Sequence, residues 1–370
     1  MRLLQRPLIS LAVPGLLLPL VLIAQTGCLA YSFQDAESGG TAIRGLTSSS
    51  VSLCGLRSVY LIEPGTVLTN PANIPREPGL QVSGSLGPTI WVESADNPYR
   101  IQRSGLTFSP VSLYASLQPF EGVGFAAGVA RITDLSYFAQ ETDYEEAGVD
   151  TVTIVISEAE CTGGIWECSA GASFEPLGGL CIGVSAGMRF GSGTSSISID
   201  SLHTSVLDSS LSESRSWKEP AFHAGFVLAD SLMGCGMAFS SGSDGVVPVL
   251  SGGAYTMLSY LNNGTFGFEA EVSDPAGVQD VVVKLFADVP MGEHALSRWG
   301  VSFNDGEASS RAGIGFSLGM AIDLGRFGIE GGYYYWTRSR NGGPFPYQDD
   351  PVTMDDSANT LALGISYSSS

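Results

Sequence analysis

Four ionisable side chains stand in stretches of the sequence that are otherwise apolar or built from small residues. Glu269 and Glu271 occur in "FGFEAEV", Arg189 in "LCIGVSAGMRF" and His223 in "FHAGF". A charge that leaves water needs a partner. Together, the four residues could form a polar track inside the fold, or they could contact the head group of an otherwise apolar ligand.

The sequence offers little for catalysis. It has three histidines, and only His203 lies close to serine and aspartate, in "SLHTSVLDSS". A serine hydrolase needs these groups oriented in space, and one serine-rich loop does not establish that. No phosphate loop, haem motif or nucleotide fingerprint occurs. None of the six cysteines has the CxxC or Cys/His spacing of a metal site. The sequence therefore predicts no enzyme, no cofactor and no metal site.

The elements that carry the four ionisable residues have the pattern of strands with one large and one small face. In "AGIGFSLGMAIDL" (312–324), large apolar residues alternate with glycine, serine and alanine. The same alternation recurs at 122–132, at 180–190 and in the C-terminal "NTLALGISYSSS". Period-two alternation is the signal of a β-strand. By this alternation, the four ionisable residues belong to the small faces.

Composition indicates what the two faces meet. Apolar residues make up 44% of the 370 residues and charged residues 15%, against roughly 25% charged residues in soluble domains. Beyond the N-terminus, no apolar run reaches the length of about 18 residues that a membrane helix needs. An all-β fold, a transmembrane antiparallel β-barrel, fits both facts, with the large residues facing lipid and the small ones facing the lumen. A large soluble β-sandwich or propeller is the alternative, but its outer faces would carry charges.

The turns and loops predict about fourteen strands between residues 79 and 368. Short turns such as "EPLGG" alternate with mostly longer connections, as in outer-membrane barrels with short periplasmic turns. The apolar run "TVTIVISEAE" (151–160) breaks the alternation, and we assign it to a long external loop, as an extra hairpin with 164–174. Cys161 and Cys168 flank the turn "TGG" and could form a disulfide; small unpaired core residues are the alternative.

The N-terminus has the plan of an export signal. Two arginines precede a long apolar segment and a group of small residues in "MRLLQRPLISLAVPGLLLPLVLIAQTGCLAYS". Cleavage after Ala30 is favoured, while acylation at Cys28 and an uncleaved anchor stay open. The next 48 residues are rich in Gly, Ser, Thr and Pro, and the small inward faces favour their folding into the lumen. The predicted organisation is a signal peptide (1–30), a hatch or plug (31–78) and a barrel (79–370).

Charge restricts the partners. The net charge is −20, with lysine only at Lys218 and Lys284, which argues against nucleic acid because nucleic acid needs basic patches. Acidic residues cluster in "ETDYEE" (141–146) and "QDDPVTMDD" (348–356). These stretches are predicted to be solvated external loops, and the alternative is that they bind divalent cations, which prefer clustered carboxylate oxygens.

Ion pairing is the simplest role for the inward charges. The predicted plug contains Arg44, Arg57 and Arg76, and buried charges need partners. We therefore favour ion pairs between plug and wall over a ligand track. A second motif, "YYYW" (333–336), lies near the outer end of a long strand. We interpret it as part of an interfacial aromatic belt, with a ligand-stacking site as the alternative.

Two stretches carry a resemblance to a known family. "TNPANI" (69–74) stands just before the first strand, and "LQPFEGVGFAAGVARITDLSY" (117–137) follows it. With them the chain resembles the FadL-type outer-membrane transporters of long-chain fatty acids and aromatic hydrocarbons, and their PorV-like relatives. The first stretch is similar to the NPA signature of that family and the second to its first periplasmic hairpin.

The resemblance implies a fourteen-stranded barrel plugged by an N-terminal hatch. It also implies that hydrophobic substrates are captured outside and released sideways through the wall. Two features depart from the family. The C-terminus is "SYSSS", so Tyr367 would have to serve as the terminal aromatic residue, and the sequence has no clear copy of a fatty-acid carboxylate site.

The predicted function is the passage of small hydrophobic molecules, fatty-acid-like or aromatic, across the outer membrane of a bacterial cell, with outer-membrane lipid around the barrel. One alternative is a PorV-like accessory barrel for secretion or surface attachment, which transports nothing. Another is a general diffusion porin. A porin should have an open, charged lumen, and the mostly small inward residues argue against one. The residues assigned to the substrate pathway are Asn70, Pro71, Ala72, Arg189, His223, Glu269 and Glu271.

Overall fold

A computed structural model describes most of the chain. The described residues are 41–43, 45–75, 78–95, 101–135, 137–146, 152–201, 209–244, 246–273, 280–305, 313–341 and 353–369. The predicted export signal with Cys28 lies outside them, as do Arg44, Arg76 and His203. In the described ranges, no helix combines the length and the apolarity that crossing a membrane requires.

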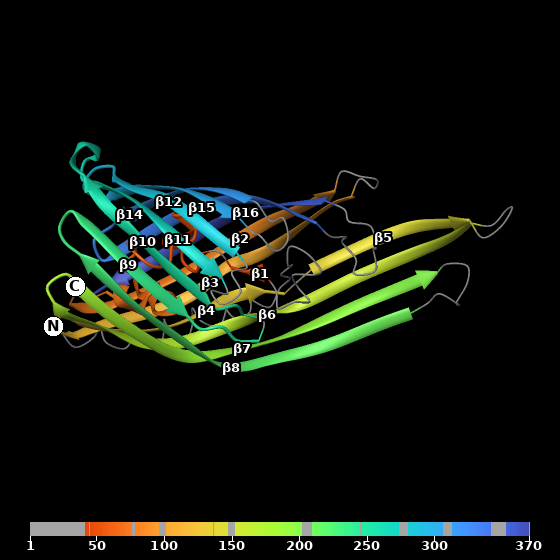
Figure 1. Cartoon of the computed structure of the whole chain (residues 1–370), viewed down its shortest axis with the longest axis horizontal. Coiled ribbons are helices and arrows are strands. Elements are labelled where there is room, and N and C mark those ends of the chain that lie inside the picture. Colours follow the sequence, from red (N-terminus) through yellow and green to blue (C-terminus); the bar gives the residue numbers. More distant parts are fainter. Residues whose placement is uncertain are drawn as a thin grey trace, which may run out of the picture.

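Fourteen antiparallel strands form a closed ring (Figure 1). They are β2 (Gly79–Ala95), β3 (Ile101–Phe120), β4 (Val123–Asp134), β6 (Val152–Leu177), β7 (Leu180–Ser201), β8 (Ser209–Ala229), β9 (Met233–Ser240), β10 (Val249–Leu258), β11 (Gly264–Ser273), β12 (Asp280–Pro290), β13 (Ala295–Asp305), β14 (Gly313–Asp323), β15 (Phe327–Asn341) and β16 (Thr353–Ser368). The ring is complete because β4 pairs with both β3 and β6, and β16 pairs with β2. The predicted barrel of about fourteen strands is confirmed.

The two faces of the strands point as the alternation predicts. On β16, Leu361, Leu363 and Ile365 point outward and are 46%, 59% and 65% exposed, whereas Ala362 between them is fully buried. The other strands of the ring repeat this arrangement, with aromatic and aliphatic side chains outside and mostly Gly, Ala and Ser inside. A closed ring with an apolar outer surface is the architecture of a transmembrane barrel, because each strand satisfies its backbone through its neighbours.

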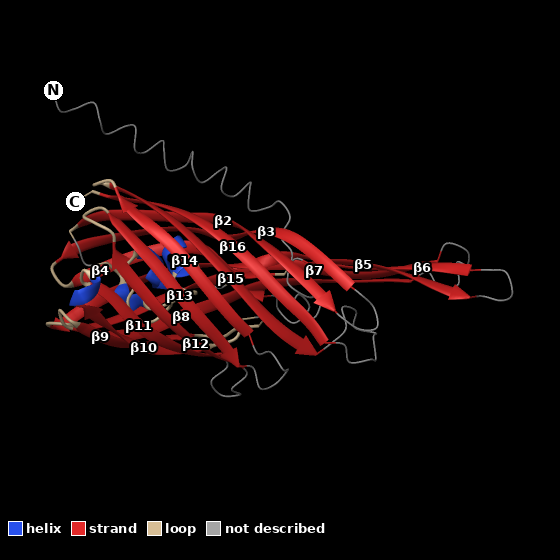
Figure 2. Ribbon diagram, turned by 90° about the horizontal axis from the view of Figure 1, so that it is seen from above, coloured by secondary structure: helices blue, strands red, loops and turns tan. Residues whose placement is uncertain are grey.

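Four strands project beyond the ring at the end opposite the short turns (Figures 1 and 2). The outer parts of β6, β7 and β8 pair with one another, and β5 (Tyr137–Glu146) extends the sheet by pairing with residues 152–161 of β6. The extra hairpin expected at 151–160 therefore exists, but its partner is 137–146. The expected pairing with 164–174 is wrong, because β6 runs without a turn from Val152 to Leu177.

The glycines in "TGG" continue β6 instead of turning the chain. Gly163 pairs with Gly193 of β7 and has a φ of 122°, a value that suits glycine. Because β6 stays extended, Cys161 points into the interior and is buried, while Cys168 points outward and is exposed. The two thiols lie on opposite faces of one strand, so they cannot form a disulfide with each other.

The wall is irregular where β2, β3 and β4 meet. Pro88 of β2 and Pro110 of β3 stand at neighbouring levels, and the register of these two strands shifts between Leu86 and Pro88. Proline has no N–H to give to a ladder. The two prolines therefore weaken the sheet at one level of two adjacent strands.

The pairing between β3 and β4 also ends partway along the wall. The ladder reaches from the turn up to Ser112 opposite Ala130. Beyond that level, Thr133 and Asp134 of β4 pair with the two-residue strand β1 (Thr41–Ala42) instead of with β3. Residues 101–111 of β3 and 131–134 of β4 keep their other neighbours, β2 for the first range and β6 and β1 for the second, but do not pair with each other. We call this part of the wall the β3–β4 break.

Residues 45–75, which we call the lumenal segment, lie inside the ring (Figure 2). They contain α3 (Ser48–Ser52) and the 3₁₀ turns η1 (Pro64–Leu68) and η2 (Pro71–Asn73); a third, η3 (Ser259–Leu261), joins two barrel strands. Most of the segment is buried against the inward faces of the strands. That the segment plugs a channel, and that the domains divide at residues 31 and 79, remain predictions.

Candidate functional site

Local caps shape the lumenal segment. Thr47 begins α3, because its Oγ1 accepts a hydrogen bond from an N–H of the first turn at 3.1 Å. Asn70 begins η2 in the same way: its Oδ1 accepts the N–H of Ala72 at 3.1 Å, and Pro71 takes the first position. Caps of this kind satisfy the donors that a short helix leaves unpaired. A stretch rich in Gly, Ser and Pro can therefore fold compactly without joining the sheet.

The Asn70-Pro71-Ala72 turn is seated against glycines of β7 and β8. A Cβ on Gly183 would lie 2.2 Å from the backbone N of Ala72, and one on Gly225 would lie 2.1 Å from Asn70 Oδ1. Only hydrogen fits between these strands and the turn. The small inward faces of β7 and β8 are thus explained by contact with the segment, and the assignment of the three turn residues to a substrate pathway remains a prediction.

Replacing Asn70 with alanine is expected to loosen this turn. Besides capping Ala72, Asn70 donates Nδ2 to the carbonyl oxygen of Ser58, so the variant removes one hydrogen bond from a buried N–H and one from a buried C=O. We expect a loss of about 1–3 kcal/mol, seen as faster hydrogen exchange of residues 45–75. Asn73→Ala is the matched control, because its Nδ2 lies 3.4 Å from the same carbonyl. Equal exchange in the two variants would contradict the role of Asn70.

Glu269 is the centre of a buried network that joins the lumenal segment to β11. It is fully buried. Its carboxylate accepts hydrogen bonds from the N–H of Arg57 (3.0 Å), from the N–H of Ser58 (2.5 Å) and from Ser58 Oγ (2.6 Å). Lys284 Nζ of β12 lies 3.0 Å from the same carboxylate. A carboxylate with this many donors fixes the lumenal segment firmly to β11.

Lys284 completes the network from the neighbouring strand. Its ammonium donates to the carbonyl oxygen of Gly55 at 2.7 Å and lies 2.7 Å from Glu271. Arg57 Nε lies 3.5 Å from Glu271 as well. The expected ion pairing between the segment and the wall is therefore present for Arg57. Sequence reasoning missed Lys284, although it stands directly opposite Glu269 in the hairpin.

Arg189 and His223 form a second buried network, within the wall. Both contact Glu167 of β6: Arg189 Nε at 3.0 Å and His223 Nε2 at 2.5 Å. His223 Nδ1 lies 2.9 Å from Ser240 Oγ. The two residues thus find their partner on another strand and not in the lumenal segment. Sequence reasoning missed Glu167. The pattern that could have revealed it is a carboxylate on the small-residue face of an alternating stretch.

A third group, which we call the carboxylate cluster, consists of Glu63, Asp288, Arg298 and Glu330. Arg298 of β13 lies between Asp288 of β12 (3.4 Å) and Glu330 of β15 (3.2 Å). Glu63 belongs to the lumenal segment and accepts a hydrogen bond from Thr47 Oγ1 at 2.6 Å. The cluster fixes the segment to the side of the barrel opposite the Asn70 turn.

The helix α3 packs mainly on β15 and β14, and its first residue, Ser48, lies at the junction of β2 and β16. The N–H of Ser48 donates to Ser85 Oγ of β2 at 3.0 Å. On the other side of the junction, a Cβ on Gly364 of β16 would lie 2.0 Å from Ser48 Oγ. Ser48 Oγ also donates to Glu330 at 2.9 Å, so one residue of α3 contacts three strands.

Aromatic side chains gather inside the barrel, toward the end opposite the short turns. Trp91 of β2 stacks on Tyr137 with ring centroids 6.0 Å apart, and Tyr334 and Trp336 of β15 belong to the same buried cluster. The interpretation of "YYYW" as an interfacial belt is therefore wrong for Tyr334 and Trp336. Strand alternation turns these two side chains inward, whereas Tyr333 points outward and is exposed.

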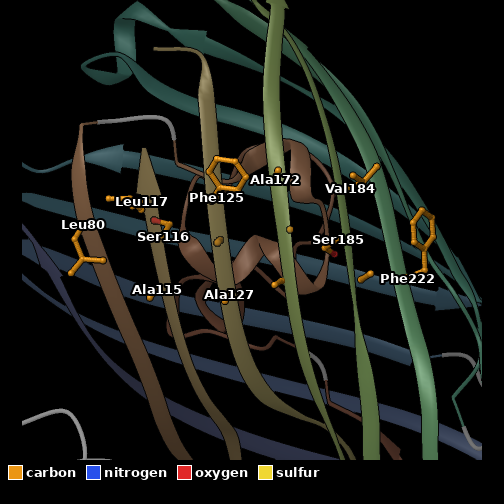
Figure 3. Close-up of a pocket in the computed structure, with 14 residues that line it drawn as sticks. Leu80, Ala115, Ser116, Leu117, Phe125, Ala127, Ala172, Val184, Ser185 and Phe222 are labelled. Carbon is orange, nitrogen blue, oxygen red and sulfur yellow. The ribbon is translucent and has the colours of Figure 1, made fainter. Parts of the chain in front are cut away.

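An apolar groove of about 630 Å³ runs over the outer surface of β3, β4, β6, β7 and β8, with Leu80 of β2 at its edge (Figure 3). Its middle is formed by small residues, among them Ala115, Ala127 and Ala172. Phe125 and Phe222 stand beside them with their rings on the outer side (Figure 3). The groove begins at Ala115 and Ala127, a few residues closer to the β3–β4 turn than Ser112 and Ala130, where the pairing of the two strands ends.

Metal binding finds no support among the described residues, where no group of three or more His, Cys, Asp or Glu side chains could hold an ion. The stretch "ETDYEE" belongs to β5 and is not a loop as expected, because it pairs with β6. The second acidic stretch, 348–356, lies partly outside the described residues. A divalent-cation site at these acidic stretches remains a prediction.

Comparison with known proteins gives matches of structure only. No family model matches the sequence, and no curated protein matches it. Among solved structures, the P. putida toluene transporter TodX has a TM-score of 0.59 at 11% identity, over 88% of this chain and 98% of that one. A Pseudomonas aeruginosa FadL homologue has a TM-score of 0.61 at 10% identity, over 89% and 99%.

A third similar structure is the Ralstonia pickettii toluene transporter TbuX. It has a TM-score of 0.54 at 11% identity, over 87% of this chain and 98% of that one. At identities this low, structural similarity supports a shared fold but does not identify the ligand. The barrel is thus similar over most of its length to these three structures. The segment "TNPANI" and the hairpin at 117–137 had already suggested a FadL-type barrel. The chain has the fold of the FadL-type barrels.

Proposed function

We propose that this chain is an outer-membrane barrel of a bacterial cell and that it passes small hydrophobic molecules across that membrane. The location is supported by the apolar outer surface of a closed ring, since a bilayer requires both. The 32 N-terminal residues, which have the pattern of an export signal, agree with it.

One observation carries the proposed passage: a break in strand pairing beside an apolar outer groove. The lumen along the barrel axis contains the lumenal segment, which leaves a route through the wall as the alternative. At the β3–β4 break, β3 and β4 are joined by side chains, with Thr107 Oγ1 donating to Asp134 at 2.7 Å. Such contacts separate at less cost than a continuous ladder. A molecule leaving there meets the groove at Ala127 and then lipid.

The substrate class follows from the surfaces along this route. Inside stands the aromatic cluster of Trp91 and Trp336, and outside stands a groove whose lining is almost entirely apolar. TodX and TbuX are described as toluene transporters. An aromatic hydrocarbon or a fatty-acid-like molecule suits these surfaces. A general diffusion porin suits them poorly, because its lumen must admit water and ions.

Filling the groove is expected to slow uptake strongly. Ala127→Trp places a large side chain at the point where a released molecule would enter lipid. The measurement is the initial rate of uptake of labelled toluene, and separately of a long-chain fatty acid, by cells that make this barrel and lack their own transporter of this type. Ala270→Trp, at an outward position of β11, is the matched control. Unchanged uptake in Ala127→Trp, with both variants folded, would refute the lateral route.

A second candidate function is an accessory role like that of PorV-like barrels. The projecting sheet of β5 to β8 favours it. In the part of the chain that the structure describes, residues 209–216 of β8 are exposed on both faces and their backbone pairs with β7 alone. A strand edge of this kind can receive another chain. Replacing residues 196–212 with a short turn separates the candidates. A transporter keeps its uptake without this outer edge of β7 and β8, whereas an accessory barrel loses its exported partner.

No catalytic role is proposed. Ser240, His223 and Glu167 are linked by hydrogen bonds, but the serine contacts Nδ1 of the imidazole and the carboxylate also pairs with Arg189. All are buried. A nucleophile needs a substrate within reach, and these groups are explained by mutual pairing within the wall.

A further inference from the structure

The carboxylate cluster contains three acids and a single cation. Arg298 pairs with Asp288 and Glu330 through different nitrogens. Glu63 makes no ion pair in the described part of the chain and relies on hydroxyl donors. Asp288 Oδ1 is buried without a hydrogen-bond partner among the described residues. If all three carboxyl groups were ionised, three negative charges, one buried at Asp288 and two half-buried at Glu63 and Glu330, would face a single guanidinium, which is costly.

Apart from β13, which supplies Arg298, the elements packed around Glu63 bring negative charge or none. Glu330 comes from β15 and Asp288 from β12, and Arg298 of β13 is the one cation. Tyr60 of the lumenal segment donates its hydroxyl to Asp288 at 3.1 Å. Tyr114 of β3 packs near Gly65 and brings an uncharged phenol. The geometry therefore favours one shared proton.

That proton resides on Glu63. Burial, and then the neighbouring charge of Glu330, raise the pKa of Glu63 from 4.5 to about 7. Thr47 Oγ1 opposes the shift by donating to the carboxyl group, without reversing it. The protonated group adds no charge to the cluster and leaves Arg298 to balance Glu330 and Asp288.

We propose that proton binding by the carboxylate cluster latches the lumenal segment to β12, β13 and β15, and that loss of this proton at higher pH releases it. The cluster would thus be a pH-sensitive latch between the segment and the wall. The proposal rests on the proposed function only in the consequence of release, which is an easier passage through the barrel. The latch itself can be observed without any substrate.

The direction of the pH dependence follows from comparing the pKa of Glu63 in the seated and in the released segment. Released into water, Glu63 titrates near its ordinary pKa of 4.5, and seated in the cluster it titrates at about 7. The seated segment therefore holds an extra proton between these values, so its stability is full below about pH 4.5 and falls until about pH 7. The difference corresponds to a change of up to about 300-fold in the equilibrium between seated and released segment.

Hydrogen exchange at several pH values tests the latch. The full-length protein in detergent micelles is pulse-labelled between pH 4 and 9, and the protection of peptides from residues 45–75 is measured by mass spectrometry. Peptides from the strands of the same molecule correct for the direct effect of pH on exchange. In the native protein, we expect the relative protection of the segment to fall with rising pH and to level off above about pH 7.

Two variants identify the group responsible. Glu63→Gln cannot ionise and is expected to keep the segment protected at every pH. Glu330→Gln removes the negative neighbour of Glu63 and is expected to shift the fall toward lower pH; it also serves if Glu63→Gln does not fold. Glu213→Gln, on the exposed part of β8, is the control and should behave as the native protein does.

The outcomes separate the latch from the proposed function. Flat protection in the native protein, or the same fall in Glu63→Gln as in the native protein, would overturn the latch. A fall that disappears in Glu63→Gln supports it. If that fall is present while uptake of toluene and of fatty acid is absent at every pH, the latch stands and the transport role fails. If uptake is present with flat protection, only the latch fails.

Discussion

Replacing Lys284 with methionine is expected to separate the lumenal segment from β11 and β12 and to destabilise the barrel by about 3–5 kcal/mol. Methionine has a similar length but no charge, so Glu269 and Glu271 lose the cation that lies 3.0 Å and 2.7 Å from them. The carbonyl of Gly55 loses its donor as well. The costly product is two carboxylates that have lost their nearest cation, with Arg57 Nε remaining 3.5 Å from Glu271.

The other lysine of the chain is the control for this prediction. Lys218 is exposed on β8, and Lys218→Met is expected to cost less than about 0.5 kcal/mol. The measurement is the urea concentration at which each variant loses the faster gel migration of the unboiled, folded barrel. Ion conductance in planar bilayers gives the second readout, with a higher open probability expected for Lys284→Met alone. Equal midpoints for the two variants would disprove the central role of Lys284.

Valine at Gly183 is expected to displace the Asn70 turn from the wall. Because the Cβ would lie 2.2 Å from backbone atoms of Pro71 and Ala72, no rotation of a side chain can relieve the clash. Overpacking of this kind costs about 1–3 kcal/mol, and here the turn must move because strand β7 is held on both sides. The expected result is loss of hydrogen-exchange protection at residues 70–74 and a higher conductance.

Gly331→Val is the matched control for Gly183→Val. Gly331 also lies in the middle of a strand, but a Cβ there would have only a side-chain atom of Leu363, at 3.9 Å, within 4 Å. The valine is therefore accommodated on the outer surface of β15. If both variants keep the segment protected, the contact between Gly183 and the turn does not hold the segment in place.

The sequence predicted the ring because its pattern is local. Large and small residues alternate with the same period as the strand itself, and glycine-rich turns separate the runs. The same logic placed Glu269 and Arg189 on the inner face. It failed at Gly163 and Gly164, because glycine permits a turn without requiring one. The paired strand β7 decides between the two conformations, and no short stretch of sequence contains that information.

The partners of the inward charges could not be predicted in the same way. The carboxylate of Glu269 meets Ser58, and Ser48 meets Glu330, across separations of 211 and 282 residues. Such contacts depend on how a compact segment is seated in a closed ring. Lys284 and Glu167 could have been found from strand register, but only once each hairpin had been aligned. The carboxylate cluster needed the full set of contacts, since it draws on three strands and the segment.

The position of α3 has a consequence for how the molecule is built. β2 and β16 are the first and the last strand of the ring, so their junction is the seam at which the sheet becomes a cylinder. Ser48 contacts both sides of that seam. The residue that begins α3 thus bridges the first and the last strand of the ring from the inside. Closure of the cylinder and seating of the segment therefore stabilise each other, because opening the seam would remove contacts of Ser48.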